Sequence, residues 1–310
     1  MHLALTVRGF APHGRAMSLV RRILVPLALV FLVLVSGLSA CAIGNATGWS
    51  VPQRTLAEQQ ALLDGHVEIR RPETATGPVP ALIMLHGCGG LRDVQTAYAD
   101  SVLAAGYAVV IVDSNGARGI GRFGAMSRVC TAQTLWGQDR AADIAAVLDQ
   151  LAQAPGIDGD RLALIGWSHG GWSLMEALAY SGSGDQPRAL SGHGLSLTPQ
   201  VRLAIAMYPY CGIPMRTSGA DIDPAIPLRA ILAEQDVIAP HNACVRRLER
   251  ARAAGADVSY NVWDGQSHAF DEPNPPPDPR IRYDAEAAQR ARDQVVDWMD
   301  EIFTSPPDQG

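Results

Sequence analysis

Two kinds of hydrophobic pattern alternate along most of this chain, and the alternation constrains the fold more than any other feature of the sequence. Short, largely apolar runs are typical of strands in a parallel sheet, and they occur at 66–71, 81–86, 107–113, 161–167, 201–208, 228–233 and 258–263. Segments with apolar residues at three- and four-residue spacing are typical of helices, and they occur at 96–105, 136–152, 170–181, 242–254 and 284–303. The order predicts an α/β fold with a mostly parallel, doubly wound sheet and helices on both faces.

Nothing in the sequence divides this region into smaller domains. We find no internal repeat and no linker. The proline-rich stretch at 271–280 is expected to be a stiff extended loop, because another helix follows it. The Gly/Ser-rich stretch at 181–197 is expected to be a surface loop. Neither is long enough for a large cap domain, so the predicted site is fairly open.

The first forty residues have the layout of a secretory signal. Arginines at 21 and 22 precede an apolar run at 23–38, and small residues follow at 39 and 40. The run is shorter than the roughly 20 apolar residues of a spanning helix, which favours cleavage over a signal anchor. Residues 38–41, Leu-Ser-Ala-Cys, resemble the lipobox of bacterial lipoproteins, which implies acylation of Cys41. An ordinary signal peptide is the alternative, and either Met1 or Met17 fits as the start.

These features predict three segments: a signal peptide at 1–40, a tether at 41–65 that includes a short helix, and the α/β domain at 66–305. The predicted location is the bacterial cell envelope, where an acylated Cys41 would anchor the protein to a lipid bilayer facing the periplasm or the exterior. A soluble secreted protein is the alternative.

The charge balance excludes one class of partner. The chain carries 25 basic residues against 31 acidic ones, for a net charge of −6, and all 25 are arginines. A nucleic-acid-binding protein needs a basic face, and no run in the sequence supplies one. The 47% of hydrophobic residues argues against disorder.

Four cysteines remain after the predicted signal. Export places Cys88, Cys130, Cys211 and Cys244 in an oxidising compartment, where three pairings are possible. We favour Cys88 with Cys130 and Cys211 with Cys244, because each pair joins loops at the same end of the predicted sheet. Free buried thiols are the alternative. No cysteine or histidine cluster has the spacing of a metal site, and no cofactor is expected.

A nucleophile motif lies where a predicted strand meets a predicted helix. Residues 166–170, Gly-Trp-Ser-His-Gly, match the G-x-S-x-G pattern that holds a serine on a sharp strand-to-helix turn. The flanking glycines allow strand and helix to approach closely. Ser168 is therefore the candidate nucleophile.

A serine hydroxyl needs a base, and the base needs a third group to orient it. Asp236 follows the predicted strand at 228–233, and His268 follows the strand at 258–263, so both lie at carboxyl ends of strands, where sites of α/β sheets form. Their order after Ser168 is that of the α/β-hydrolase triad.

Other acidic and histidine residues compete for these roles. Glu234 lies two residues before Asp236 but closer to the strand. His241 follows Asp236 too closely to face it, and His86 is expected to brace a loop. The residues with weaker context are Asp257 and Asp264, expected in turns, and His66 and His193.

The oxyanion of an acyl-transfer intermediate needs backbone donors. One expected donor is the N–H of His169. The other is placed at Cys88, with Gly89 as the next choice, in the loop 86–90, His-Gly-Cys-Gly-Gly, which resembles the H-G-G-G type of oxyanion loop.

Taken together, these motifs resemble the dienelactone hydrolase family of α/β-hydrolases. The resemblance rests on residues 86–90, 113–119, 166–171, Asp236 and the Ser-His-Ala-Phe run at 267–270, and it extends over roughly 66–303. It implies an α/β-hydrolase fold with Ser168, Asp236 and His268 as nucleophile, acid and base. Dienelactone hydrolase itself uses a cysteine nucleophile, so the family name does not identify the substrate here.

The function predicted from the sequence is a serine esterase that acts on a small-molecule carboxylic ester or lactone-like bond through an acyl-enzyme. The alternatives are a peptidase or acyltransferase with the same triad, and a non-catalytic exported lipoprotein that uses the fold for binding. Five aromatic residues are candidates to line an acyl pocket: Phe123, Trp167, Trp172, Tyr208 and Tyr210.

Overall fold

The computed structural model describes residues 14–47, 49, 51–192 and 194–304, and it divides the chain into two compact units, Met1–Ser50 and Val51–Gly310. The first unit contains helix α1 (Gly14–Thr47), which includes the apolar run of the predicted signal. Among the described residues, no helix combines the length and the apolar character needed to cross a membrane. Met1 and the side chain of Cys41 lie outside the described part, so the signal and lipidation predictions stay predictions.

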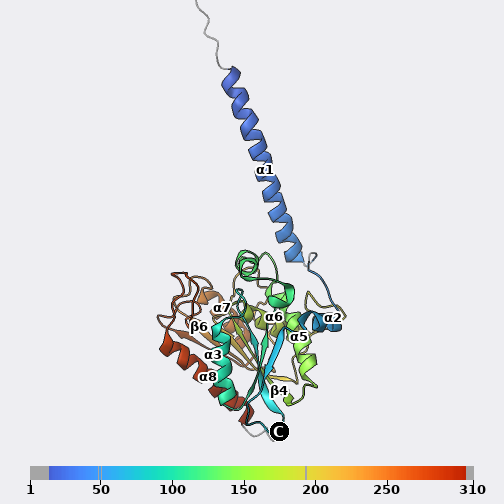
Figure 1. Ribbon diagram of the computed structural model, residues 1–310, viewed down its shortest axis with the longest axis vertical. Coiled ribbons are helices and arrows are strands. Elements are labelled where there is room, and N and C mark those ends of the chain that lie inside the picture. Colours follow the sequence, from blue (N-terminus) through green and yellow to red (C-terminus); the bar gives the residue numbers. More distant parts are fainter. Residues whose placement is uncertain (1–13, 48, 50, 193, 305–310) are drawn as a thin grey trace, which may run out of the picture. The chain divides into compact units, whose positions relative to one another are not determined.

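The second unit is built on one central sheet (Figure 1). Its seven strands have the order β1–β3–β2–β4–β5–β6–β7. Only the edge pair β1–β3 is antiparallel, and every other pair is parallel. The strands are β1 (Val67–Arg70), β2 (Val79–Leu85), β3 (Ala108–Val112), β4 (Ile157–Trp167), β5 (Val201–Met207), β6 (Leu228–Ala233) and β7 (Val258–Trp263). This confirms the predicted α/β fold and its seven strands.

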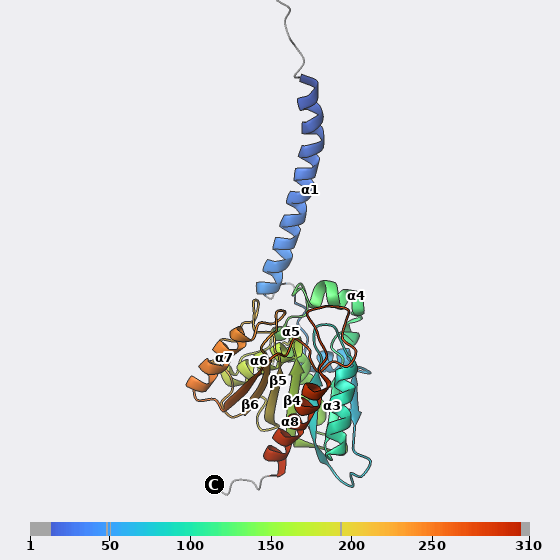
Figure 2. The ribbon, with the colours of Figure 1, turned by 90° about the vertical axis from the view of Figure 1, so that its left-hand side faces the viewer.

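Helices cover both faces because the central strands are apolar on both sides. In β2, Ile83 and Leu85 belong to one hydrophobic cluster, whereas Leu82 and Met84 belong to the other. The first cluster is covered by α2 (Leu56–Leu63), α5 (Gly137–Leu151), α6 (His169–Ser183) and α7 (His241–Ala253). The second is covered by α3 (Asp93–Ala104) and α8 (Ala285–Thr304), which lie side by side in Figure 2.

The strand order places a topological switch point between β2 and β4. From β2 the chain continues outward to β3, and from β4 it continues the other way to β5, β6 and β7. Ligand sites of open α/β sheets form at such points, outside the carboxyl ends of the strands. The loops that follow β2 and β4 carry the predicted oxyanion donors and Ser168.

The structure refines two of the segments expected from the sequence. The short helix expected within the predicted tether at 41–65 is α2, and it packs against α5: Leu63 is in the core, and the Gln59 amide donates a hydrogen bond to buried Asp143. The stretch at 181–197 is not simply a surface loop. Helix α6 continues to Ser183, and Leu190 and Leu195 are buried.

The segment after β3 contains short helices that the sequence patterns did not predict. They are η1 (Gly116–Arg118), α4 (Arg122–Gly124) and η2 (Ala125–Val129), which is a π-helical turn. Each is too short to show an amphipathic period, so no periodicity could reveal them. The segment ends at Cys130.

Two disulfides form, in the pairing that we favoured. Cys88 is joined to Cys130, which ties the loop after β2 to the end of η2. Cys211 is joined to Cys244, which ties the loop after β5 to the first turn of α7. Both crosslinks therefore lie at the carboxyl edge of the sheet and connect segments that surround the switch point.

Loss of the second disulfide should lower stability. The Cys211→Ala/Cys244→Ala variant removes a crosslink between residues 33 apart in sequence. Without it the unfolded chain gains conformational entropy, which lowers the free energy of unfolding by about 2–4 kcal/mol. Urea denaturation without reductant measures the change. An unchanged urea midpoint would show that this crosslink does not constrain the protein.

Candidate active site

Ser168 lies on a strained turn between β4 and α6. Its φ of 51° and ψ of −109° lie in a region that non-glycine residues rarely adopt. The turn is held by β5 and the loop that follows it: the Ser168 N–H donates to the carbonyl of Met207 at 2.9 Å, and the Ser168 carbonyl accepts from the N–H of Tyr210 at 3.0 Å. These two hydrogen bonds fix Ser168 at the carboxyl end of the sheet.

The glycines around Ser168 are required by close backbone approach. A Cβ on Gly170 would collide with the carbonyl oxygen of Leu85, at the end of β2, and a Cβ on Gly166 would collide with the backbone of Gly170. Only glycine at these positions lets α6 begin against both strands. The motif is therefore a packing requirement as well as a chemical signature.

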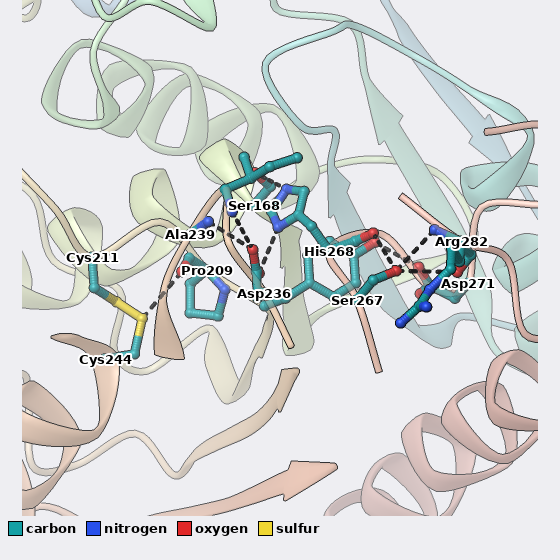
Figure 3. Close-up of polar contacts among 12 residues, drawn as sticks. Ser168, Pro209, Cys211, Asp236, Ala239, Cys244, Ser267, His268, Asp271 and Arg282 are labelled. Carbon is teal, nitrogen blue, oxygen red and sulfur yellow. Dashed lines mark hydrogen bonds and ion pairs between the residues drawn. A yellow bond between two sulfur atoms is a disulfide. The ribbon is translucent and has the colours of Figure 1, made fainter. Parts of the chain in front are cut away.

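The structure brings Ser168, His268 and Asp236 into one hydrogen-bonded chain (Figure 3). His268 Nε2 lies 2.9 Å from Ser168 Oγ, and His268 Nδ1 lies 2.6 Å from Asp236 Oδ2. The carboxylate can only accept, so the proton of the neutral ring is assigned to Nδ1, and Nε2 is left to accept from the serine hydroxyl. Both His268 and Asp236 are buried.

The second oxygen of Asp236 fixes the carboxylate. Oδ1 accepts hydrogen bonds from the N–H groups of Ile238, at 2.9 Å, and Ala239, at 2.7 Å. These bonds close a turn directly after β6, so that Oδ2 faces His268. Glu234 does not take this place: its carboxylate accepts from the N–H of Gly265 at 2.9 Å.

A buried carboxylate behind His268 organises its loop, and the sequence analysis missed it. Asp271 accepts hydrogen bonds from Tyr208 Oη at 2.6 Å, Tyr98 Oη at 2.8 Å and Trp167 Nε1 at 3.3 Å. The ring of Tyr208 stands edge-on to His268, with centroids 5.0 Å apart. Burial raises the pKa of Asp271, and the two tyrosine hydrogen bonds offset part of that effect. The loop of the candidate base is thereby tied to the strand that precedes Ser168.

The loop after β2 lies beside the nucleophile. A Cβ on Gly87 would be 3.7 Å from the Cβ of Ser168. His86 Nδ1 lies 2.6 Å from the carbonyl oxygen of Gly87, and Asn115 Nδ2 donates to the carbonyl of Cys88 at 3.0 Å. Since the Gly87 carbonyl and the Cys88 N–H share one peptide unit, holding the carbonyl fixes the direction of that N–H.

Both expected oxyanion donors are free to bind a ligand. His169 is the first residue of α6, where N–H groups have no partner within the helix. Within the described part of the chain, the Cys88 N–H donates to no other residue. His86 braces the loop, as expected, and its neutral state follows from burial, which lowers its pKa well below the ordinary value.

Most of the aromatic residues proposed for an acyl pocket lie in the core. Trp167 and Trp172 are buried, and their ring N–H groups donate to Asp271 and Glu176. Tyr208 is buried as well, whereas Phe123 is 87% exposed. Sequence pattern alone does not separate core aromatics from pocket aromatics.

The remaining candidates do not belong to this hydrogen-bonded chain in the described part of the structure, and His193 lies outside the described residues. Asp257 pairs with Arg229, and His241 is the first residue of α7. Among the residues that the structure describes, no group of three or more His, Cys, Asp or Glu side chains is placed to hold a metal ion.

Comparison with known proteins identifies the same kind of scaffold. The family model described as "Dienelactone hydrolase family" matches residues 66–303. A probable dipeptidyl-aminopeptidase B from Fusarium vanettenii is 31% identical over 140 residues, which are 43% of this chain but only 14% of that protein. The chain thus spans a small part of that relative's length.

Solved structures share the fold. A putative dienelactone hydrolase from Klebsiella pneumoniae superposes with a TM-score of 0.59 and 18% identity, covering 75% of this chain and 91% of that one. A dienelactone hydrolase-like promiscuous phosphotriesterase from metagenomic libraries gives 0.60 and 20%, covering 76% and 92%. The family match spans nearly all of the second unit, and this chain belongs to the dienelactone hydrolase family.

Proposed function

We propose that this protein is a serine hydrolase that cleaves carboxylic esters or lactone-like bonds through an acyl-enzyme. The observation that carries the proposal is the continuous contact from Ser168 Oγ through His268 to Asp236. A serine hydroxyl within reach of an oriented, neutral imidazole is an activated nucleophile. The hydrolase family and the free N–H groups beside Ser168 support the same chemistry.

Each residue then has a defined step. Ser168 Oγ attacks the ester carbonyl while His268 Nε2 takes its proton, and the N–H groups of Cys88 and His169 bind the oxyanion. The intermediate collapses, the alcohol leaves with the proton from His268, and Ser168 remains acylated. Water then attacks the acyl-enzyme while His268 takes its proton. The second intermediate collapses to release the acid, and the proton returns to Ser168 Oγ. Asp236 stabilises the imidazolium throughout.

We propose an apolar rim of three exposed side chains in loops that adjoin site residues, and this rim favours an ester with an apolar group. Leu91 follows the oxyanion loop, Val237 follows Asp236, and Ile213 lies in the loop whose Tyr210 binds the Ser168 carbonyl; the exposed fractions are 43%, 64% and 90%. Large apolar side chains left in solvent beside a site mark a contact surface for an apolar ligand. We therefore propose a medium-length or longer acyl chain.

A peptidase is the second candidate, and one observation favours it: the 31% identity to a probable dipeptidyl-aminopeptidase B over 140 residues. The same triad cleaves amides. Parallel assays of p-nitrophenyl esters and dipeptidyl p-nitroanilides separate the two candidates, because an esterase turns over the first and leaves the second.

Export to the cell envelope remains part of the proposal. Two disulfides support it, because such crosslinks persist in oxidising compartments. Acylation at Cys41 would add a lipid anchor. Mass analysis of the N-terminal peptide from the native host tests this directly.

Ser168→Ala should abolish ester turnover without unfolding the protein. The change removes only the attacking oxygen, and the loss of a triad nucleophile lowers kcat by at least about 1,000-fold. Intact mass after exposure to a fluorophosphonate should show one adduct on the parent protein and none on the variant. Thermal unfolding provides the control for folding. An adduct that persists in the variant would place the nucleophile elsewhere.

Ile213→Ser should change acyl-chain preference. Removing one apolar contact costs about 1–2 kcal/mol of binding, so the kcat/KM ratio of p-nitrophenyl octanoate to acetate should fall about tenfold. The matched control is Ile69→Ser, an exposed isoleucine on the edge strand β1. An equal fall for both esters, or an unchanged ratio, would remove the apolar rim from the proposal.

A further inference from the structure

A buried arginine lies beneath the two proposed oxyanion donors, and the triad chemistry gives it no role. Arg140, in the first turn of α5, is 1% exposed. Burial lowers its pKa to about 10, so the guanidinium remains charged at neutral pH. A cation buried in this way carries a substantial desolvation cost.

The guanidinium contacts both segments that supply the donors. Arg140 Nη1 donates to the carbonyl of His86 at 2.8 Å, at the start of the oxyanion loop. The same nitrogen lies 3.1 Å from His169 Nδ1. Arginine can only donate, so His169 Nδ1 accepts and the ring is neutral. Nε donates to Ser114 Oγ at 3.1 Å, which fixes the guanidinium against the end of β3.

The charge of Arg140 is not neutralised by a direct ion pair. Within the described residues, no carboxylate oxygen lies within 4 Å of its guanidinium nitrogens. The nearest acids are engaged elsewhere: Asp143 binds Arg118 at 2.8 Å, and Asp113 accepts from the N–H of Gly116 at 2.8 Å.

The other titratable groups near Arg140 are either neutral or already paired. Burial and the nearby guanidinium lower the pKa values of His86 and His169 well below the ordinary value, so both rings are neutral. Arg118, the second cation nearby, is paired with Asp143. Nη2 of Arg140 is buried with no hydrogen-bond partner among the described residues. A buried donor left unpartnered calls for a reason beyond packing.

We propose that Arg140 is a positioning residue for the oxyanion hole, which holds the His86–Gly87 peptide and His169 in register and adds positive potential where the intermediate carries negative charge. The proposal rests on the serine-hydrolase function above. A fixed charge in a low-dielectric region acts on a developing anion without having to reorganise during the reaction. Arg140 should therefore affect the transition state more than the ground state.

The first test compares three variants on a p-nitrophenyl ester. Arg140→Gln keeps a donor and loses the charge, and kcat should fall about 10- to 100-fold while KM changes less than threefold. Arg140→Lys keeps the charge with fewer donors and should retain more kcat than the glutamine variant. Ser114→Ala loosens the guanidinium and should lower kcat a few-fold. Equal kcat in all three and in the parent would overturn the proposal.

A second readout separates this role from packing. An alkyl boronic acid forms a tetrahedral anionic adduct with an activated serine, so its Ki should weaken by the same factor as kcat/KM in each variant. The matched control is Arg188→Met, which removes another buried arginine near α5, in contact with Asp139 and Trp136, and should leave both values unchanged. A fall in kcat without a change in Ki would reduce Arg140 to a structural residue. If the parent protein itself takes no fluorophosphonate, the serine-hydrolase function fails instead.

Discussion

The close approach of α6 to the ends of β2 and β4 is the constraint on which the rest of the site depends. Gly166 and Gly170 permit it, because any side chain at either position would meet backbone atoms. The approach places Ser168 on its strained turn, beside Gly87 in the loop of Cys88, and brings the start of α6 against Leu85 and His86. The hydrogen bonds from Tyr210 and to Met207 keep the turn from relaxing.

The sequence predicted those parts of the fold that depend on a short, regular pattern of hydrophobic residues. Short apolar or β-branched runs located the seven strands, and the turn pattern at 166–170 located Ser168, because strand, turn and helix are all local features. Asp236 and His268 followed from chain order and strand ends, and the structure places them in contact. The disulfide pairing followed from which ends of strands lie together.

What the sequence could not give are contacts that depend on distant packing. Asp271 collects donors from three separate elements, and nothing near it in the chain marks it as buried. Nothing in the sequence distinguishes Arg140 from other helix residues. Its contacts come from the ends of β2 and β3 and from α6, which are distant in the chain. The short helices at 116–129 lack the length for a periodic signal. Buried polar residues of this kind do not belong to the triad. They hold the loops and side chains that do.

The Cys88–Cys130 crosslink gives the oxyanion loop an unusual dependence on where the protein is made. The residue proposed to bind the oxyanion through its backbone is held through its side chain by a segment 42 residues away. In a reducing cytosol this crosslink is not expected to persist. We therefore expect protein recovered from such a host to contain loops with and without the crosslink, so that its measured specific activity would depend on how far Cys88 and Cys130 are oxidised.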